Sequence, residues 1–230
     1  MRADYEKLVK TNVQFLSAVE AIRKVPESAT IMVGGFGITG IPQYLLQILV
    51  DKSEVRNLTI ISNNINTDTN LYPLFKQNRI SKVIGTYFTT NKELVKAHRK
   101  GQIRVELLPQ GTFSEAIRLG GSGIPAFYTP TSVGTELAKN KETRFFNGRE
   151  HVLEESLHAD VSLIKAYKAD KAGNLIYRKT ARNFNPVMAM AADLTIVEVE
   201  EVVEIGELDP EAIITPFPFV DIIVKKEGIS

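Results

Sequence analysis

The 230-residue sequence contains no cysteine. Thiol nucleophiles, disulfide bonds and cysteine-ligated metals are therefore excluded, and the absence suits a cytoplasmic location, which we expect. The three histidines, His98, His151 and His158, have no metal-ligand spacing, so we expect no metal site. No apolar run approaches the roughly 18 residues of a membrane helix and no signal-type segment occurs, so we expect no membrane partner.

A surplus of either charge is also missing. Lys and Arg number 28 against 27 Asp and Glu, which gives a net charge of +1, and 43% of the residues are hydrophobic. These values are typical of a globular protein and lack the basic excess of a nucleic-acid-binding protein, so we expect no nucleic-acid partner. No repeat and no interdomain linker is visible, and we expect a single domain over residues 1–230.

Short apolar, β-branched runs alternate with helical stretches in the first half of the chain. The pattern predicts an amphipathic helix over 5–25, strands at 29–33, 58–61, 82–87 and 103–108, and helices after Pro42 and around 71–77, 92–100 and 113–119. Such alternation indicates βαβ units. We therefore expect an α/β fold with a mostly parallel sheet flanked by helices.

The second half of the chain adds β structure to this pattern. The stretch "GGSGIPAFYTPTSVGT" predicts a long ordered loop, and Asn147-Gly148 is a strong signal for an added β-hairpin. Later strands are expected at 159–167, 175–177 and 194–203, with a turn at 170–174 and a helix over 187–192. For the glutamates at 198, 200, 201 and 204, a strand edge or a solvated face is a better interpretation than a metal site.

The glycines of "VGGFGITGIP" have the spacing Gly35-x-Gly37-x-x-Gly40 of a dinucleotide-binding motif. A NAD site needs an acidic residue at the end of the second strand, where this chain has Ser62, Asn63 and Asn64. A P-loop needs Lys and Ser or Thr after the last glycine, where this chain has Ile and Pro. The sequence therefore argues against both nucleotide sites.

What remains is a loop whose backbone N–H groups converge on a ligand. Pro42 begins a helix, and the positive end of that helix is expected to face the same point. The loop should then hold an anion or a polarised carbonyl oxygen. The alternative is a tight turn that lets the helix pack close to the strand.

The sequence offers no obvious nucleophile for this loop. Ser122 lacks the full motif of a hydrolase nucleophile, and His98 is most simply a cation at a helix C-terminus. Glu115 and Glu136 are expected on the surface. Three further basic residues, Arg178, Lys179 and Arg182, could bind a phosphate-bearing ligand or be plain surface.

Six motifs in order carry a resemblance to a known family. "GGFGITGIP", "SNN", "LLPQGT", "GGSGIPAFYTPT", "GNLIYRKTARNFNP" and "VEVEEVVEIGELDP" resemble the alpha (A) subunit of family I coenzyme A transferases, which include succinyl-CoA:3-oxoacid and acetate/acetoacetate CoA-transferases. The likeness runs from about residue 15 to about residue 224. The glycine loop looks closest to the oxoacid and acetoacetate branch, and the choice of acid stays open.

The resemblance implies half of an enzyme. In this family the nucleophilic glutamate lies in a Ser-Glu-Asn-Gly motif of the beta subunit, and that motif is absent here. The implied partner is a beta subunit, in a heterodimer or a dimer of heterodimers. The implied substrates are CoA thioesters and short-chain carboxylic acids, and no permanently bound cofactor is implied.

The resemblance also implies which residues bind substrate. The glycine motif of the family would wall the acyl and carboxylate pocket, paired asparagines would contact substrate, and a glutamine would donate to the acid. These residues are Gly34, Gly35, Phe36, Gly37, Gly40, Asn63, Asn64 and Gln110. One departure lies before the first strand, where the family has Asp or Asn followed by Gly and this chain has Glu27-Ser28, so the turn there is expected to differ.

Two alternatives to this function are left open by the sequence. One is a stand-alone sugar-phosphate isomerase or NAD-dependent oxidoreductase, which would need an internal base or a ribose-binding acid. The other is a module without catalysis, in which the glycine loop holds an acyl-CoA or a carboxylate.

Overall fold

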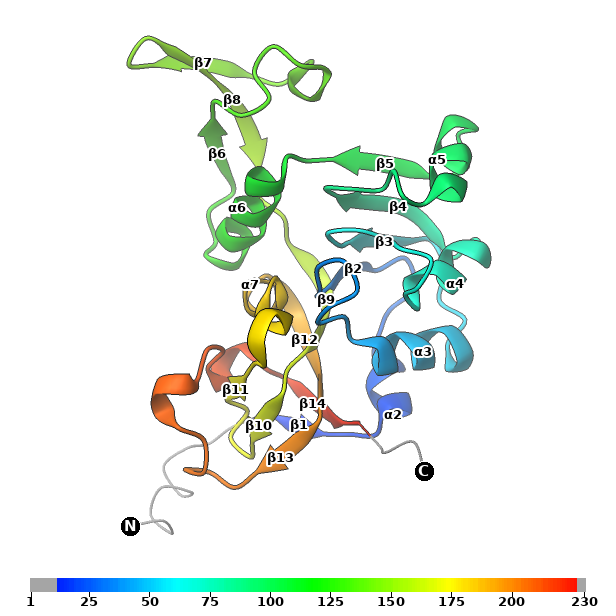
Figure 1. Ribbon diagram of the computed structural model, residues 1–230, viewed down its shortest axis with the longest axis vertical. Coiled ribbons are helices and arrows are strands. Elements are labelled where there is room, and N and C mark those ends of the chain that lie inside the picture. Colours follow the sequence, from blue (N-terminus) through cyan, green and yellow to red (C-terminus); the bar gives the residue numbers. More distant parts are fainter. Residues whose placement is uncertain (1–11, 227–230) are drawn as a thin grey trace.

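A single parallel sheet forms the centre of the protein in the computed structural model, which describes residues 12–226 (Figure 1). Every strand pairing within the sheet is parallel. Its eight strands are, in spatial order, β1 (Gln14–Phe15), β14 (Ile222–Lys225), β12 (Ala192–Val199), β9 (Ala159–Lys165), β2 (Thr30–Val33), β3 (Leu58–Ile61), β4 (Ile80–Gly85) and β5 (Arg104–Leu107). The expected α/β fold is confirmed.

Helices cover both faces of this sheet (Figure 1). One face carries α2 (Ala18–Ile22), α3 (Gln43–Lys52), α4 (Leu71–Lys76) and α5 (Lys92–Arg99), and the other carries α6 (Gln110–Gly121) and α7 (Asn185–Ala189). Along β2, Ile31 and Val33 pack into the first core and Met32 into the second. Strands buried on both faces are apolar at successive positions, which is why the central strands were visible in the sequence.

Two small sheets complete the fold. The antiparallel sheet of β6 (Ala126–Thr129), β8 (Arg149–Glu155) and β7 (Thr143–Phe146) projects from the top of the molecule in Figure 1. The other sheet contains β11 (Leu175–Ile176), β10 (Lys168–Asp170) and β13 (Glu201–Val203). Short 3₁₀ helices are η1 (Glu136–Ala138), η2 (Lys179–Arg182), η3 (Pro210–Ala212) and η4 (Phe217–Phe219).

Both turns predicted from the sequence are present. Asn147 and Gly148 join β7 to β8 with φ of 50° and 74°, the left-handed pair that a two-residue hairpin requires. In the turn after β10, Asp170 Oδ1 accepts from the amides of residues 172–174. At the departing turn before β2, Ser28 has φ of 58°, so serine here adopts a conformation that favours glycine.

Several predicted elements differ in extent. The helix expected over 5–25 is wrong where the structure describes it, because β1 and the short α2 lie there; residues 5–11 lie outside the described range. The expected loop at 120–135 contains the end of α6 and strand β6, and the helix expected over 187–192 is α7, which ends before β12 begins. Within residues 12–226, none of the helices has the length and apolar character needed to cross a membrane.

The strands expected at 159–167 and 194–203 are each divided between two sheets. β9 leaves the large sheet and continues as β10, while β12 continues as β13, and β10 and β13 pair in parallel again. At the bend, the amide of Glu200 donates to the carbonyl of Tyr167 at 3.0 Å. Apolar residues continue across this bend, so the sequence pattern could not reveal it.

Candidate active site

The residues implied by the sequence lie at the carboxyl edge of the large sheet. The glycine loop, residues 34–40, follows β2, and Asn63 and Asn64 follow β3. Thr86 follows β4, and Gln110 begins α6 just after β5. Open α/β sheets bind ligands at this edge.

The glycines of the loop have different physical roles. A side chain at Gly34 would clash with Asn185, one at Gly35 with Ile41, and one at Gly40 with the carbonyl of Ala181. These three glycines therefore allow close packing, as the tight-turn alternative expected. Gly37 is different, because its φ is 64° and a side chain there would meet nothing within 4 Å.

Asn64 holds the tip of the loop in place. Its Nδ2 donates to the Gly37 carbonyl and its Oδ1 accepts from the Gly37 amide, both at 2.9 Å. The Gly37 amide is therefore already engaged. In the described part of the chain, the amides of Gly35, Ile38 and Gly40 have no acceptor, so they are the donors that the loop can offer to a ligand.

A second group of polar side chains, the amide cluster, contains Asn63, Thr86 and Gln110. Asn63 Nδ2 donates to Thr86 Oγ1 at 2.8 Å and to Gln110 Oε1 at 2.9 Å. Thr86 Oγ1 also lies 2.9 Å from Gln110 Oε1. Asn63 is buried and Gln110 is exposed, and Gln110 Nε2 has no acceptor among the described residues. The cluster therefore turns one amide donor outward, in a fixed position.

Thr86 was missed by the sequence analysis. It stands at the end of the third strand, at the same edge as the asparagines, so its strand position could have identified it. Asn183 and Asn185 were also missed as parts of the site. They lie far along the chain in "ARNFNP", and only the fold brings them against the glycine loop.

Phe36 adds an apolar surface to the loop. It is 52% exposed and stacks on Phe184 with a ring-centroid distance of 6.5 Å. Phe184 in turn contacts Phe113 edge-on at 5.3 Å. The aromatic row fixes the exposed ring of Phe36 beside the loop.

The positive end of α3 does not face a ligand, contrary to the expectation from sequence. The amides of Tyr44 and Leu45 donate to Glu198 Oε2 at 2.9 and 3.1 Å. Glu198 is only 2% exposed, so its interpretation as a solvated face is also wrong. A carboxylate from β12 neutralises the helix end and anchors α3 behind the glycine loop.

Glu198 should make stability depend on pH. Burial is the main cause that raises the pKa of its carboxyl above the ordinary 4.5, against the two backbone donors and the charge of Lys165. The folded protein then binds this proton more tightly than the unfolded chain, so the stabilisation is present at low pH and is lost as pH rises through the folded pKa.

We expect Glu198→Gln, which is neutral throughout, to gain stability relative to the wild type as pH rises from about 4.5 to 7. Urea unfolding across this range measures the difference. Glu200→Gln, at the exposed neighbouring position, controls for the loss of one negative charge. A difference that stays constant or shrinks with rising pH would contradict the account.

The other residues considered in the sequence analysis have local roles. Ser122 Oγ donates to the Arg118 carbonyl at the end of α6, and His98 lies in the last turn of α5. Glu115 forms an exposed ion pair with Arg118 at 2.7 Å. Among residues 12–226, no group of three or more His, Asp or Glu side chains is placed to hold a metal ion.

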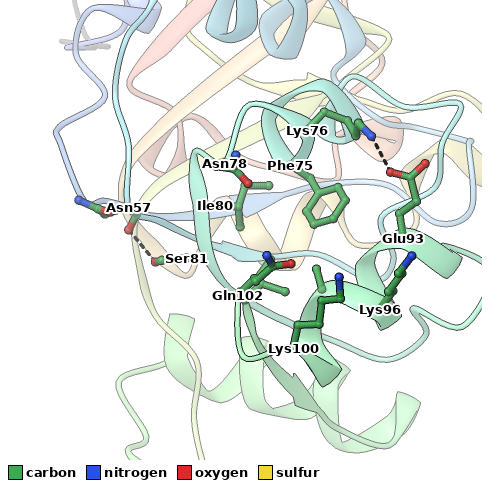
Figure 2. Close-up of a pocket in the computed structure, with 12 residues that line it drawn as sticks. Asn57, Phe75, Lys76, Asn78, Ile80, Ser81, Glu93, Lys96, Lys100 and Gln102 are labelled. Atoms are coloured by element: carbon green, nitrogen blue, oxygen red, sulfur yellow. Dashed lines mark hydrogen bonds and ion pairs between the residues drawn. The ribbon is translucent and has the colours of Figure 1, made fainter.

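The largest groove lies away from the glycine loop. It has a volume of about 590 Å³ and is bordered by the starts of β4 and β5, with Lys96 and Lys100 of α5 at its rim (Figure 2). Lys76 and Glu93 form an ion pair of 2.7 Å across it (Figure 2). Because this is the amino edge of the sheet, we assign the groove no part in the site.

Comparison with known proteins places these features in one family. The family model described as Coenzyme A transferase matches residues 15–226. The chain is 47% identical over 209 residues to the A subunit of the succinyl-CoA:3-ketoacid coenzyme A transferase of Helicobacter pylori (strain J99), and the match covers 90% of each chain. It is 47% identical over 222 residues to the A subunit of the 3-oxoadipate CoA-transferase of Pseudomonas putida, covering 95% of this chain and 96% of that one.

The fold has the same relatives. The acyl-CoA transferase apoenzyme of Escherichia coli O157:H7 superposes with a TM-score of 0.81 at 21% identity. That match covers 93% of this chain and 47% of the other, so this fold corresponds to about half of that polypeptide. These relatives give no support to an isomerase, an NAD-dependent oxidoreductase or a module without catalysis.

Proposed function

The chain belongs to the coenzyme A transferase family, and on that premise we propose that it is the alpha subunit of a heteromeric enzyme. The enzyme moves CoA between a short-chain acyl-CoA or succinyl-CoA and a carboxylic acid such as acetoacetate or acetate. Residues 1–230 form its single alpha-subunit domain, which is expected in the cytoplasm.

One observation supports this proposal above the others. The site edge offers neutral donors, in the glycine loop and the amide cluster, and the carboxylate at the start of α3, Glu198, is buried and bonded to two amides. Such a surface can receive carboxylic acids in turn without trapping them in salt bridges. The nucleophile must then come from another polypeptide.

The expected reaction is a double displacement in which that nucleophile is a glutamate of the beta subunit. Its carboxylate attacks the thioester carbonyl and expels CoA thiolate, which leaves an acyl-glutamyl anhydride. The thiolate then attacks the glutamyl carbonyl, releases the first acid and forms a glutamyl-CoA thioester. A second carboxylate reverses the two steps and leaves with the CoA.

This chain would bind and orient the acyl group in each step. We place the acid beside Gln110, whose free Nε2 can donate to a carboxylate or a keto oxygen. The free loop amides would meet the oxygen on which charge develops, and one such donor is worth about 3 kcal/mol in comparable enzymes. Asn64 acts through the loop it holds. CoA thioesters are substrates here and need no resident cofactor.

Purification of the chain alone and with a beta subunit tests the proposal. We expect CoA exchange among acetoacetate, acetate, butyrate and succinate only when both chains are present. The second chain should carry a glutamate that borohydride reduction or hydroxylamine traps as its CoA thioester. Strong activity of the lone chain, or a thioester on one of its own side chains, would overturn the division of labour.

Gln110→Ala tests the placement of the acid. We expect it to lower kcat/KM for the preferred acid by about 10-fold or more, as expected for loss of one oriented donor, while the complex still forms. Steady-state kinetics with several acids measures the change, and Gln102→Ala, an exposed glutamine at the opposite edge, is the control. Unchanged kinetics for every acid would remove Gln110 from the site.

A further inference from the structure

Three basic side chains stand beside the glycine loop at residues 178–182, which we call the basic segment. Two cavities of about 240 and 520 Å³ adjoin this segment, and Thr39, Lys179 and Thr180 line both of them. Arg178 lines the smaller cavity, and Arg182 lines the larger one. The loop and the basic segment thus share one continuous hollowed surface.

The basic segment is fixed to the loop by two asparagines. Asn183 Nδ2 donates to the Thr39 carbonyl at 3.0 Å. Asn185, which is fully buried, donates from Nδ2 to the carbonyls of Gly40 at 3.0 Å and Ala181 at 2.8 Å. The positions of the three cations are therefore set by the same bonds that set the loop.

The backbone of this segment is held in unusual conformations. Lys179 has φ of 52°, and Asn183 has φ of 21° with ψ of −117°. Non-glycine residues in such regions cost about 1–3 kcal/mol each and persist only where surrounding contacts enforce them. Two of them within five residues indicate that this shape serves a purpose beyond connecting β11 to α7.

The positive charges of the segment are not neutralised within the chain. Among residues 12–226, no carboxylate lies within 4.0 Å of Arg178, Lys179 or Arg182. Lys165, which lines the smaller cavity with them, does have such partners in Glu198 and Glu200. The guanidinium of Arg178 lies over the Tyr167 ring at 5.3 Å, which leaves its N–H edge free. Unpaired cations beside a cavity attract an anion.

The sheet order indicates which anion this is. The amide cluster lies on one side of the glycine loop, at β3, β4 and β5, while β9, β12 and the basic segment lie on the other. A thioester with its carbonyl at the loop and its acyl end at the amides must extend its thiol half toward the cations. Resting on the proposed function, we propose that the basic segment binds the phosphate groups of the CoA half of the substrate.

The test uses the assembled two-subunit enzyme with Arg178, Lys179 and Arg182 all changed to Gln. We expect kcat/KM for the acyl-CoA to fall at least 10-fold, and inhibition by adenosine 3′-phosphate 5′-diphosphate to weaken by a similar factor. Turnover of the same acyl group carried on pantetheine, which lacks these phosphates, should stay within about 2-fold of the wild type. The difference between the two thioesters should shrink at high salt.

A matched variant controls for the loss of three positive charges. Lys96→Gln, Lys100→Gln and Arg104→Gln together remove three exposed cations at the amino edge of the sheet. This variant should keep wild-type kinetics with both thioesters.

Each other result overturns the inference in a distinct way. An equal loss with both thioesters places the segment in acyl binding or loop structure. A loss confined to dicarboxylic acyl groups makes the cations a carboxylate site, and failure to co-elute with the second subunit makes them a subunit contact. Wild-type enzyme that transfers no CoA between any pair of acids refutes the proposed function itself.

Discussion

Gly37→Val is expected to lower kcat/KM of the assembled enzyme at least 100-fold while leaving the two subunits associated. Gly37 has φ of 64°, and a side chain there would meet nothing within 4 Å. The new side chain would therefore project into the open space above the loop, where we place the substrate. The β-branched residue would also strain the loop tip, and a displacement of about 1 Å at a reacting group can cost 100-fold in rate.

Gly101→Val separates backbone strain from the position of the site. Gly101 has φ of 70° and equally open surroundings, but it follows α5 at the amino edge of the sheet. We expect both variants to lose about 1–2 kcal/mol of stability from the left-handed conformation, and only Gly37→Val to lose activity. Kinetics, co-elution and urea unfolding of both proteins make the comparison. Normal turnover in Gly37→Val would refute the placement of the loop.

Much of the central sheet could be predicted because its residues interact locally. Runs such as Leu58–Ile61 are apolar on both faces and end at polar residues, and Asn147-Gly148 fits only a narrow set of turns. By contrast, β1 has two residues and α2 has five, and both depend on packing against β14 rather than on their own sequence. Short elements of this kind carry too few residues to show a period.

The site was only partly visible for a similar reason. Glycine spacing and polar strand ends are local signals, and they identified the loop, Asn63, Asn64 and Gln110. Whether a polar residue faces the ligand or the protein depends on partners far along the chain. Glu198 reads as one of several surface glutamates until the fold places it against the amides of α3, which begins 155 residues earlier.

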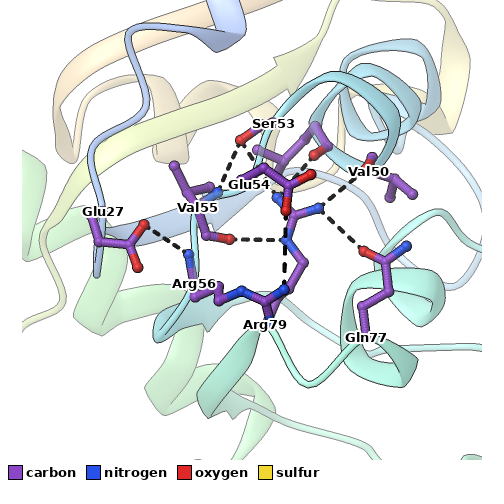
Figure 3. Close-up of polar contacts among 9 residues, drawn as sticks. Glu27, Val50, Ser53, Glu54, Val55, Arg56, Gln77 and Arg79 are labelled. Atoms are coloured by element: carbon purple, nitrogen blue, oxygen red, sulfur yellow. Dashed lines mark hydrogen bonds and ion pairs between the residues drawn. The ribbon is translucent and has the colours of Figure 1, made fainter.

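Arg79 shows the same dependence at the opposite end of α3 (Figure 3). Its side chain is 2% exposed, and burial lowers its pKa. Its guanidinium donates to the carbonyls of Leu49 at 3.0 Å, Val50 at 3.2 Å and Val55 at 2.9 Å. The first two belong to the last turn of α3, where carbonyls have no partner within the helix. A buried cation thus caps the C-terminus of α3, while buried Glu198 caps its N-terminus.

Arg79→Met keeps the apolar stem of the side chain but leaves these buried carbonyls without donors. We expect the free energy of unfolding to fall by about 3 kcal/mol, since each unsatisfied buried acceptor costs about 1–3 kcal/mol and partial relaxation recovers some of the sum. Arg56→Met makes the same chemical change at an exposed site, whose pair with Glu54 spans 4.0 Å, and should cost less than about 0.5 kcal/mol. Urea unfolding of both variants decides the matter: a loss below about 1 kcal/mol in Arg79→Met would show that α3 does not depend on this cap.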